Sequence, residues 1–224
     1  MKRMVLIPAY NEEATIPRVI RDIREHCQNI VVVDDGSTDF TGSMARDEGA
    51  MVISHGQNRG YAEALRTGYR HAIENRYHEL VQIDADGQHD PDHIPELFDQ
   101  GQGSDVVIGS RFLCPERYPS PPIKSVGVRI FRHIIQRETG LTITDPTSGY
   151  RYMDGRAIKF CSRLRCNYPD ANLIIMLHRQ GFIITEVPVA MSPNRQGRSM
   201  HKGKLIKYLR EVFRAITMEM KCRT

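Results

Sequence analysis

A series of short apolar runs, each followed at once by a polar cluster, is the feature of this sequence that most constrains its fold. The runs cover residues 4–9, 29–35, 50–55, 79–85 and 105–110. They have the length and the β-branched content of buried strands, and stretches with apolar residues at helical spacing lie between them. Continuous apolar strands that alternate with helices predict an α/β fold, in which a mostly parallel sheet is flanked by helices.

The polar clusters predict where a ligand binds. In parallel α/β sheets, ligands lie beyond the carboxyl ends of the strands. The first four strands lead into PAYNEE, DDGSTD, HGQNRG and DADGQH, so we expect these segments to meet at one edge of the sheet. No Gly-x-Gly-x-x-Gly fingerprint follows these strands, which argues against a dinucleotide site.

The second half of the chain has a looser pattern. Residues 124–140 and 172–181 have helical character, and residues 183–191 resemble a further strand. We expect one catalytic domain over residues 1–200 and a basic amphipathic helix over residues 201–224. Such a helix either lies on an anionic membrane surface or packs its apolar side on the catalytic domain, and the sequence leaves both arrangements open.

Composition excludes several classes of protein. The 224 residues are 40% hydrophobic and 26% charged, which suits a folded chain with a sizeable core. Five cysteines without a Cys-x-x-Cys pair favour a reduced, cytoplasmic protein over a disulfide or zinc framework. The net charge of +4 does not indicate a nucleic-acid partner. No apolar run reaches the roughly 18 residues of a membrane span, and the sequence carries no signal for oligomeric state.

Two acids one residue apart, Asp84 and Asp86, follow the fourth strand. If the backbone stays extended, their side chains point the same way and repel each other. A hard divalent cation such as Mg²⁺ or Mn²⁺ relieves this repulsion and keeps coordination positions open for substrate phosphates. The alternative is a solvated turn, in which Asp84 caps the strand and Asp86 and Gly87 form the bend.

Two further strand ends offer groups to a nucleotide. Asp35 begins a turn after the second strand, where its carboxylate can accept from the imino N–H of a uracil or a guanine. After the first strand, Tyr10 offers a flat face to a base, and Pro8 and Ala9 offer backbone groups. The alternatives are an Asp-capped turn and an ordinary loop between strand and helix.

Together these stretches resemble glycosyltransferase family 2, and within it the branch of the dolichol-phosphate mannose synthases. The matching segments are IPAYNEEATI, VVVDDGSTDFT, NRGYAEALRTGYRHA, QIDADGQHDP, VIGSRF, DPTSGYRYM and EVPVAM. They run in order over nearly the whole chain, and DADGQHDP together with DDGSTD is the most specific part. The resemblance implies the GT-A fold and an inverting, metal-dependent transfer of a sugar from a nucleotide diphosphate.

The resemblance also implies roles for individual residues. The expected contacts of the nucleotide sugar are Pro8, Ala9, Tyr10, Glu12, Asp35, Asp84, Ala85, Arg195, Arg198 and Ser199. Asp84, Asp86 and Gln88 would hold Mg²⁺ or Mn²⁺, and Arg111 would contact a donor or acceptor phosphate. The chain departs from the mannose synthases where they carry Gly-x-Ser-Lys, because Met200 follows Ser199 here. Arg198 or Lys202 would then supply the missing charge, and the donor sugar and base stay open.

The acceptor determines whether catalysis needs a base. A polyprenyl phosphate is largely ionised near neutral pH, since a phosphate monoester has a second pKa of about 6, and it needs none. A sugar hydroxyl of a glycan needs a general base, for which Asp145 is the candidate; its alternative is an Asp-Pro turn. The leading hypothesis is transfer to a polyprenyl phosphate by a cytoplasmic enzyme peripheral to the inner membrane face. The other hypotheses are transfer to a glycan hydroxyl, a nucleotidyltransferase, and a non-catalytic nucleotide-sugar-binding protein.

Overall fold

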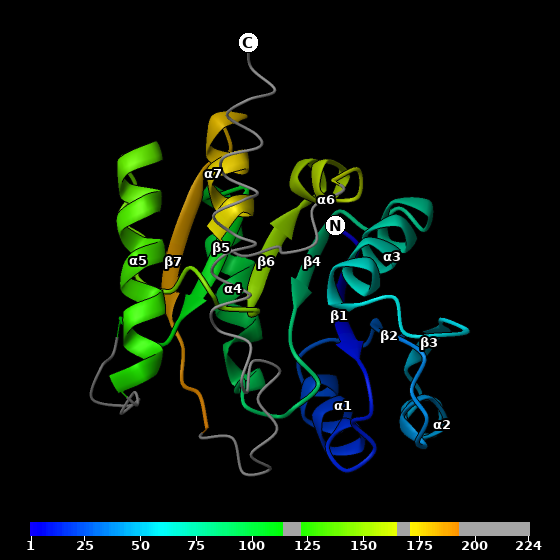
Figure 1. The fold of residues 1–224 in the computed structure, drawn as a ribbon. Coiled ribbons are helices and arrows are strands. Elements are labelled where there is room, and N and C mark those ends of the chain that lie inside the picture. The colour runs from blue at the N-terminus through cyan, green and yellow to red at the C-terminus, as the bar shows by residue number, and fades with distance from the viewer. Residues whose placement is uncertain (114–121, 165–170, 193–224) are drawn as a thin grey trace.

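Seven strands form a single sheet in the order β3-β2-β1-β4-β6-β5-β7, as the computed structural model of the chain shows (Figure 1). The structure describes residues 1–113, 122–164 and 171–192. The strands are β1 Arg3–Ala9, β2 Ile30–Asp34, β3 Met51–Ser54, β4 Glu79–Gln82, β5 Val106–Ser110, β6 Arg151–Asp154 and β7 Ile184–Pro188. The helices are α1 Ile16–Arg24, α2 Thr41–Asp47, α3 Tyr61–Glu74, α4 Ile94–Gln100, α5 Pro122–Thr139, α6 Gly155–Cys161 and α7 Ala171–Arg179. Short 3₁₀ turns, η1 Pro91–His93 and η2 Gly101–Gly103, flank α4.

The sheet is mostly parallel, as the alternation of strands and helices predicts. β1 pairs in parallel with β2 and β4, β2 with β3, and β5 with β7. Only β6 among these strands runs antiparallel, and it lies between β4 and β5. Because Arg151 at the start of β6 pairs with Gln82 at the end of β4, the loop before β6 lies at the carboxyl edge of the parallel strands.

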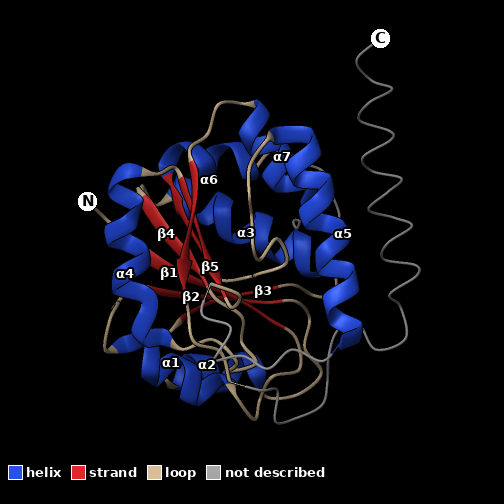
Figure 2. Cartoon of the chain, turned by 90° about the vertical axis from the view of Figure 1, so that its left-hand side faces the viewer, coloured by secondary structure: helices blue, strands red, loops and turns tan. Residues whose placement is uncertain are grey.

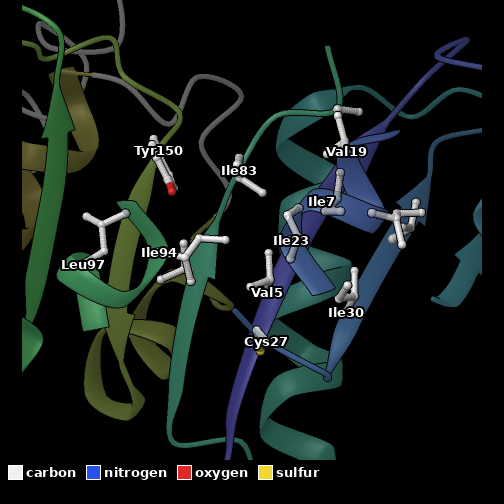
Figure 3. Close-up of a cluster of buried hydrophobic side chains, with 14 of the residues drawn as sticks. Val5, Ile7, Val19, Ile23, Cys27, Ile30, Ile83, Ile94, Leu97 and Tyr150 are labelled. Atoms are coloured by element: carbon white, nitrogen blue, oxygen red, sulfur yellow. The ribbon is translucent and has the colours of Figure 1, made fainter. Parts of the chain in front are cut away.

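Each face of the sheet is covered by its own set of helices (Figure 2). Val5 and Ile7 of β1 pack with the buried residues of α1, α2 and α4, as the close-up in Figure 3 shows for part of this cluster. Met4 and Leu6 point to the other face, where α3, α5, α6 and α7 cover them. Full burial of such a side chain contributes about 1.5–3 kcal/mol, so these two clusters stabilise the sheet from both faces.

Local sequence signals account for how the helices near the site begin. Pro17 lies in the first turn of α1, where its missing N–H costs no hydrogen bond. Asp90 precedes η1, and its side chain accepts from the backbone N–H of Asp92. Ile94, Leu97 and Phe98 of α4 are buried, as their spacing predicts. Within the described residues, no helix is both long and apolar enough to cross a membrane.

One predicted boundary is wrong in a way that matters for the site. The fourth strand was expected to continue through residue 85, but β4 ends at Gln82. Ala85 and Asp86 belong to a turn, and Gly87 adopts a positive φ of 68°, which favours glycine. The two-residue alternation of strand side chains therefore does not orient Asp84 and Asp86; the turn that follows β4 does. The expected helix over residues 201–224, and with it the domain boundary at residue 200, lies outside the described residues.

Candidate active site

The polar segments that follow the parallel strands meet at one edge of the sheet, as expected. The backbone N–H of Asp35 donates to the Ala9 carbonyl at 2.9 Å, which joins the ends of β2 and β1. The N–H of Glu12 donates to Thr41 Oγ1 at 2.7 Å. The N–H of His55, after β3, donates to the Asp34 carbonyl at 2.8 Å. These contacts hold three loops together beside the two acids that follow β4.

Asp84 is held by groups from three separate segments. Its Oδ1 accepts from the Tyr61 hydroxyl at 2.9 Å, and its Oδ2 lies 3.2 Å from His89 Nε2. Gly149, in the loop before β6, presents only hydrogen to this carboxylate, because an added Cβ would lie 2.6 Å from Asp84 Oδ2. Burial opposes ionisation of Asp84, but hydrogen bonding and charge from His89, with the Tyr61 hydrogen bond, outweigh it and lower the pKa of this carboxyl.

Tyr61 connects Asp84, through hydrogen bonds, to the buried side chains of Gln82 and Tyr69. Gln82 Nε2 donates to the Tyr61 oxygen at 2.9 Å, and the Tyr69 hydroxyl donates to Gln82 Oε1 at 2.8 Å. Burial, followed by the charge of Asp84, raises the pKa of Tyr61 well above its ordinary value, so the phenol keeps its proton and acts as a donor. The Asp84 carboxylate therefore ends a chain of hydrogen bonds that begins on α3.

Asp86 completes a pair of neighbouring acids. Its carboxylate accepts from the Gln88 backbone N–H at 3.0 Å and from Gln88 Nε2 at 2.5 Å. Burial and then the charge of Asp84 raise its pKa. Two neighbouring, partly buried carboxylates repel each other and therefore attract a cation. Their oxygens are ligands that Mg²⁺ and Mn²⁺ prefer.

The chemistry of these two side chains fits a divalent cation held with few protein ligands. Among the described residues, no group of three or more His, Cys, Asp or Glu side chains is arranged as a metal site. An ion bound by Asp84 and Asp86 would take its other ligands from Gln88, as predicted, from water and from substrate phosphates. Gln88 contacts Asp86, so it lies close to the two acids with which it was predicted to form the metal site.

Arg111, which follows β5 and is partly exposed, forms an ion pair with the buried Asp145. Arg111 Nε lies 2.6 Å from Asp145 Oδ2, and Arg111 Nη2 lies 2.7 Å from Oδ1. The Thr147 hydroxyl contacts both partners, at 2.9 Å from Arg111 Nη2 and 3.2 Å from Asp145 Oδ1. The Asp145 side chain has 0% exposure. This bidentate geometry does not favour Asp145 as the base for a hydroxyl acceptor; it shows Asp145 orienting Arg111.

The other predicted nucleotide contacts occupy the same edge. Asp35 is buried and accepts from His55 and from two backbone N–H groups of the segment before α3. Pro8 and Ala9 end β1 and are buried, Tyr10 is 45% exposed, and Ala85 is buried between the two acids. Glu12 Oε2 accepts from the Thr15 hydroxyl. Arg195, Arg198 and Ser199 lie outside the described residues.

Four residues that contribute to the site were not predicted from the sequence. Tyr61 and His89 contact Asp84, His55 contacts Asp35, and Gly149 makes room for the Asp84 carboxylate. His55 had a usable signal, because it directly follows a strand that ends at the ligand edge. Gly149 had none, because its contact depends on the antiparallel entry of β6 between β4 and β5.

The sequence is similar to a known protein family and to several named enzymes. The sequence model described as glycosyl transferase family 2 matches residues 4–160. The chain is 29% identical to the undecaprenyl-phosphate mannosyltransferase of Micrococcus luteus, over 92% of this chain and 90% of that one. It is 31% identical to the UDP-N-acetylglucosamine–dolichyl-phosphate N-acetylglucosaminyltransferase of Methanococcus voltae, over 83% of each chain.

A solved structure shows the same architecture. The glucosyl-3-phosphoglycerate synthase of Mycobacterium tuberculosis, in complex with Mn²⁺ and UDP-glucose, superposes with a TM-score of 0.70 and 25% identity. The match covers 90% of this chain and 73% of that chain. The mixed seven-stranded sheet is thus a GT-A fold, in agreement with the prediction. The chain belongs to glycosyl transferase family 2, in its dolichol-phosphate mannose synthase-like branch, and is a glycosyltransferase.

Proposed function

We propose that this enzyme transfers a sugar, with inversion, from a nucleotide diphosphate to a polyprenyl phosphate at the cytoplasmic face of a membrane. The acceptor follows the names of relatives that match most of the chain: the Micrococcus luteus enzyme acts on undecaprenyl phosphate, and the Methanococcus voltae enzyme on dolichyl phosphate. The surface location rests on this acceptor and on the basic amphipathic pattern of residues 201–224.

The donor half of the reaction rests on Asp84 and Asp86. These two residues would hold Mg²⁺ or Mn²⁺, which supplies positive charge to the diphosphate that leaves the sugar. Tyr61 and His89 keep Asp84 ionised and oriented for this task. Asp35 and Tyr10 would hold the nucleoside across the ends of β2 and β1.

The observation that carries the choice of acceptor is the pairing of Asp145 with Arg111. A hydroxyl acceptor needs a carboxylate that can take its proton, but both oxygens of Asp145 contact the Arg111 guanidinium. A phosphate acceptor needs no proton removal. In this proposal Arg111 contacts the acceptor phosphate through the side of its guanidinium that does not face Asp145, and Asp145 fixes the orientation of Arg111. Attack from the face opposite the leaving diphosphate inverts the anomeric centre.

An acceptor comparison tests this function. Purified enzyme with Mn²⁺ and a panel of radiolabelled nucleotide sugars is offered a short-chain polyprenyl phosphate, the matching polyprenol, or an oligosaccharide. We expect organic-extractable label with the phosphate alone, and NMR of the product should show the anomeric configuration opposite to that of the donor. Transfer to the oligosaccharide and not to the phosphate would contradict the proposal.

A pair of variants separates the metal assignment from general effects of charge. Asp86→Asn should lose at least about 100-fold in kcat, because it removes an anionic ligand for the cation. Asp99→Asn is the matched control, since Asp99 is an exposed carboxylate on α4. Both variants should keep the melting temperature of the unliganded protein within a few degrees. Full activity in Asp86→Asn would exclude the metal role of this residue.

A further inference from the structure

The carboxylate of Asp35 has almost all of its hydrogen-bonding capacity already used. Two oxygens of a carboxylate offer about four acceptor positions. Oδ1 contacts His55 Nδ1 at 2.6 Å and accepts from the Arg59 N–H at 2.9 Å. Oδ2 accepts from the Gly60 N–H at 2.8 Å. These bonds fill Oδ1 and leave one acceptor position, which belongs to Oδ2.

His55, one of the two donors to Asp35 Oδ1, is also hydrogen-bonded through its other ring nitrogen. His55 Nε2 lies 2.9 Å from the Thr67 hydroxyl of α3. An ionised carboxylate can only accept, so Nδ1 carries the proton in the contact with Asp35. In the neutral ring Nε2 then accepts from Thr67, and every polar atom of the imidazole is satisfied. The side chains of His55 and Asp35 are each only 4% exposed, which leaves them little room to rearrange.

The position of Asp35 fits the base end of a nucleotide whose diphosphate lies at Asp84 and Asp86. Asp35 follows β2, the acid pair follows β4, and β1 lies between these two strands. Two strand spacings amount to about 10 Å, which a ribose between base and diphosphate can cover. Tyr10 is 45% exposed at the end of β1, on the path between them.

We propose that Asp35, whose Oδ1 is filled by His55 and Arg59 and whose Oδ2 keeps one acceptor position, selects a nucleotide whose base is uracil or thymine and rejects guanine. This inference rests on the proposed function, because it names the donor base of the same site. Uracil and thymine present one imino N–H, at N3, between two carbonyl oxygens. Guanine presents two adjacent donors, N1–H and N2–H, and a carboxylate pairs with both only through one acceptor position on each oxygen.

The remaining bases are disfavoured for another reason. Adenine and cytosine have a ring nitrogen lone pair where uracil has its N3–H, and a lone pair repels the carboxylate. For guanine, the donor left without a partner at a desolvated site carries the cost of losing its water. A hydrogen bond to a charged group corresponds to roughly a 10- to 100-fold change in affinity.

Nucleotide binding to the wild-type enzyme is the primary test. Isothermal titration with Mn²⁺ present compares UDP, dTDP, GDP, CDP and 3-methyl-UDP, in which a methyl group replaces the N3 proton. We expect UDP to bind roughly 10- to 100-fold more tightly than GDP, and 3-methyl-UDP to bind as weakly as GDP. GDP binding as tightly as UDP, or 3-methyl-UDP binding as tightly as UDP, would overturn the inference and leave the proposed function standing. If UDP, dTDP, GDP and CDP all fail to bind, the proposed function fails as well.

Variants of His55 test its part as a positioning residue. His55→Leu removes the donor to Asp35 Oδ1 and opens a second acceptor position, so the ratio of GDP to UDP affinity should rise about tenfold. His55→Asn keeps an N–H donor near the position of Nδ1 and should keep the wild-type ratio. His71→Leu is the matched control, because His71 is a buried histidine of α3 remote from Asp35 in its contacts. A folded His55→Leu enzyme with an unchanged ratio would refute the assignment.

Discussion

Replacing Gly149 with alanine tests whether the loop before β6 shapes the site around Asp84. An added Cβ would lie 2.6 Å from Asp84 Oδ2, 2.9 Å from Oδ1 and 3.0 Å from Cγ. Carbon and oxygen atoms do not approach so closely without a bond, so the carboxylate has to move by about 0.8 Å to regain ordinary contact. The backbone of Gly149 does not have a positive φ, so this contact is the main effect of the substitution.

The movement has a cost that can be estimated. Asp84 is held by Tyr61 at 2.9 Å and by His89 at 3.2 Å, and a hydrogen bond to a charged group contributes about 1.5–3 kcal/mol. Partial loss of one such bond predicts a loss of about 1 kcal/mol in the free energy of unfolding. Metal ligands tolerate displacements of only about 0.2 Å, so Mn²⁺ affinity and kcat/KM should fall roughly 10- to 100-fold.

The assay is the dependence of kcat/KM on Mn²⁺ concentration, with thermal denaturation of the same preparations. Gly103→Ala is the control, because nothing lies within 4 Å of its added Cβ and its φ is not positive. That variant should match the wild type in both measurements. Wild-type Mn²⁺ dependence in Gly149→Ala would refute the reasoning, since it would mean that Asp84 does not pack on this glycine in the working enzyme.

Three other substitutions have outcomes that the structure determines. Asp145→Asn should lower the free energy of unfolding in urea by about 3 kcal/mol, because it leaves the Arg111 guanidinium without its buried partner. It should also leave the pH profile of kcat unchanged, whereas a lost acidic limb would identify Asp145 as a base. Asp39→Ala should cost about 1 kcal/mol of stability at pH 7. Burial opposes ionisation of Asp39, but hydrogen bonds from Thr41 and the Glu13 backbone lower its pKa, so this contribution is lost as the pH falls through the folded value. Urea titrations from pH 7 downward should therefore converge with the wild type; a constant difference would contradict the linkage. Gly68→Ala places a Cβ 2.3 Å from Leu6 Cδ1 between α3 and β1 and should cost about 1–3 kcal/mol in thermal melts, with kcat preserved in the folded fraction.

The sheet could be predicted because burial leaves a strong pattern in this sequence. Val5 and Ile7 face one layer of helices and Met4 and Leu6 the other, so both faces of β1 require apolar residues and the run is continuous. The strand order could not be predicted in full. β6 is a four-residue strand whose burial resembles that of its neighbours, and nothing in RYMD indicates an antiparallel place between β4 and β5.

The candidate site could be predicted only in its chemistry. Asp84, Asp86 and Asp35 were identified from their positions after strands, and the structure brings them to one edge. Their partners come from long-range contacts that no local pattern encodes: Tyr61 begins α3, 23 residues before Asp84, and Asp145 reaches Arg111 across 34 residues. Asp145 illustrates the limit, because an acid in a turn looks the same in sequence whether it is exposed to substrate or buried against arginine.

The reversed direction of β6 has a consequence for how such an enzyme can diversify. Its preceding loop returns to the edge built by the first hundred residues, so Asp145, Thr147 and Gly149 come to lie at the acids that precede them in the chain. This one loop holds Arg111 through Asp145 and leaves room for Asp84 through Gly149. Under the proposed function, a change of acceptor preference in this loop is therefore tolerated only where it leaves Gly149, and with it the metal-binding acid, undisturbed.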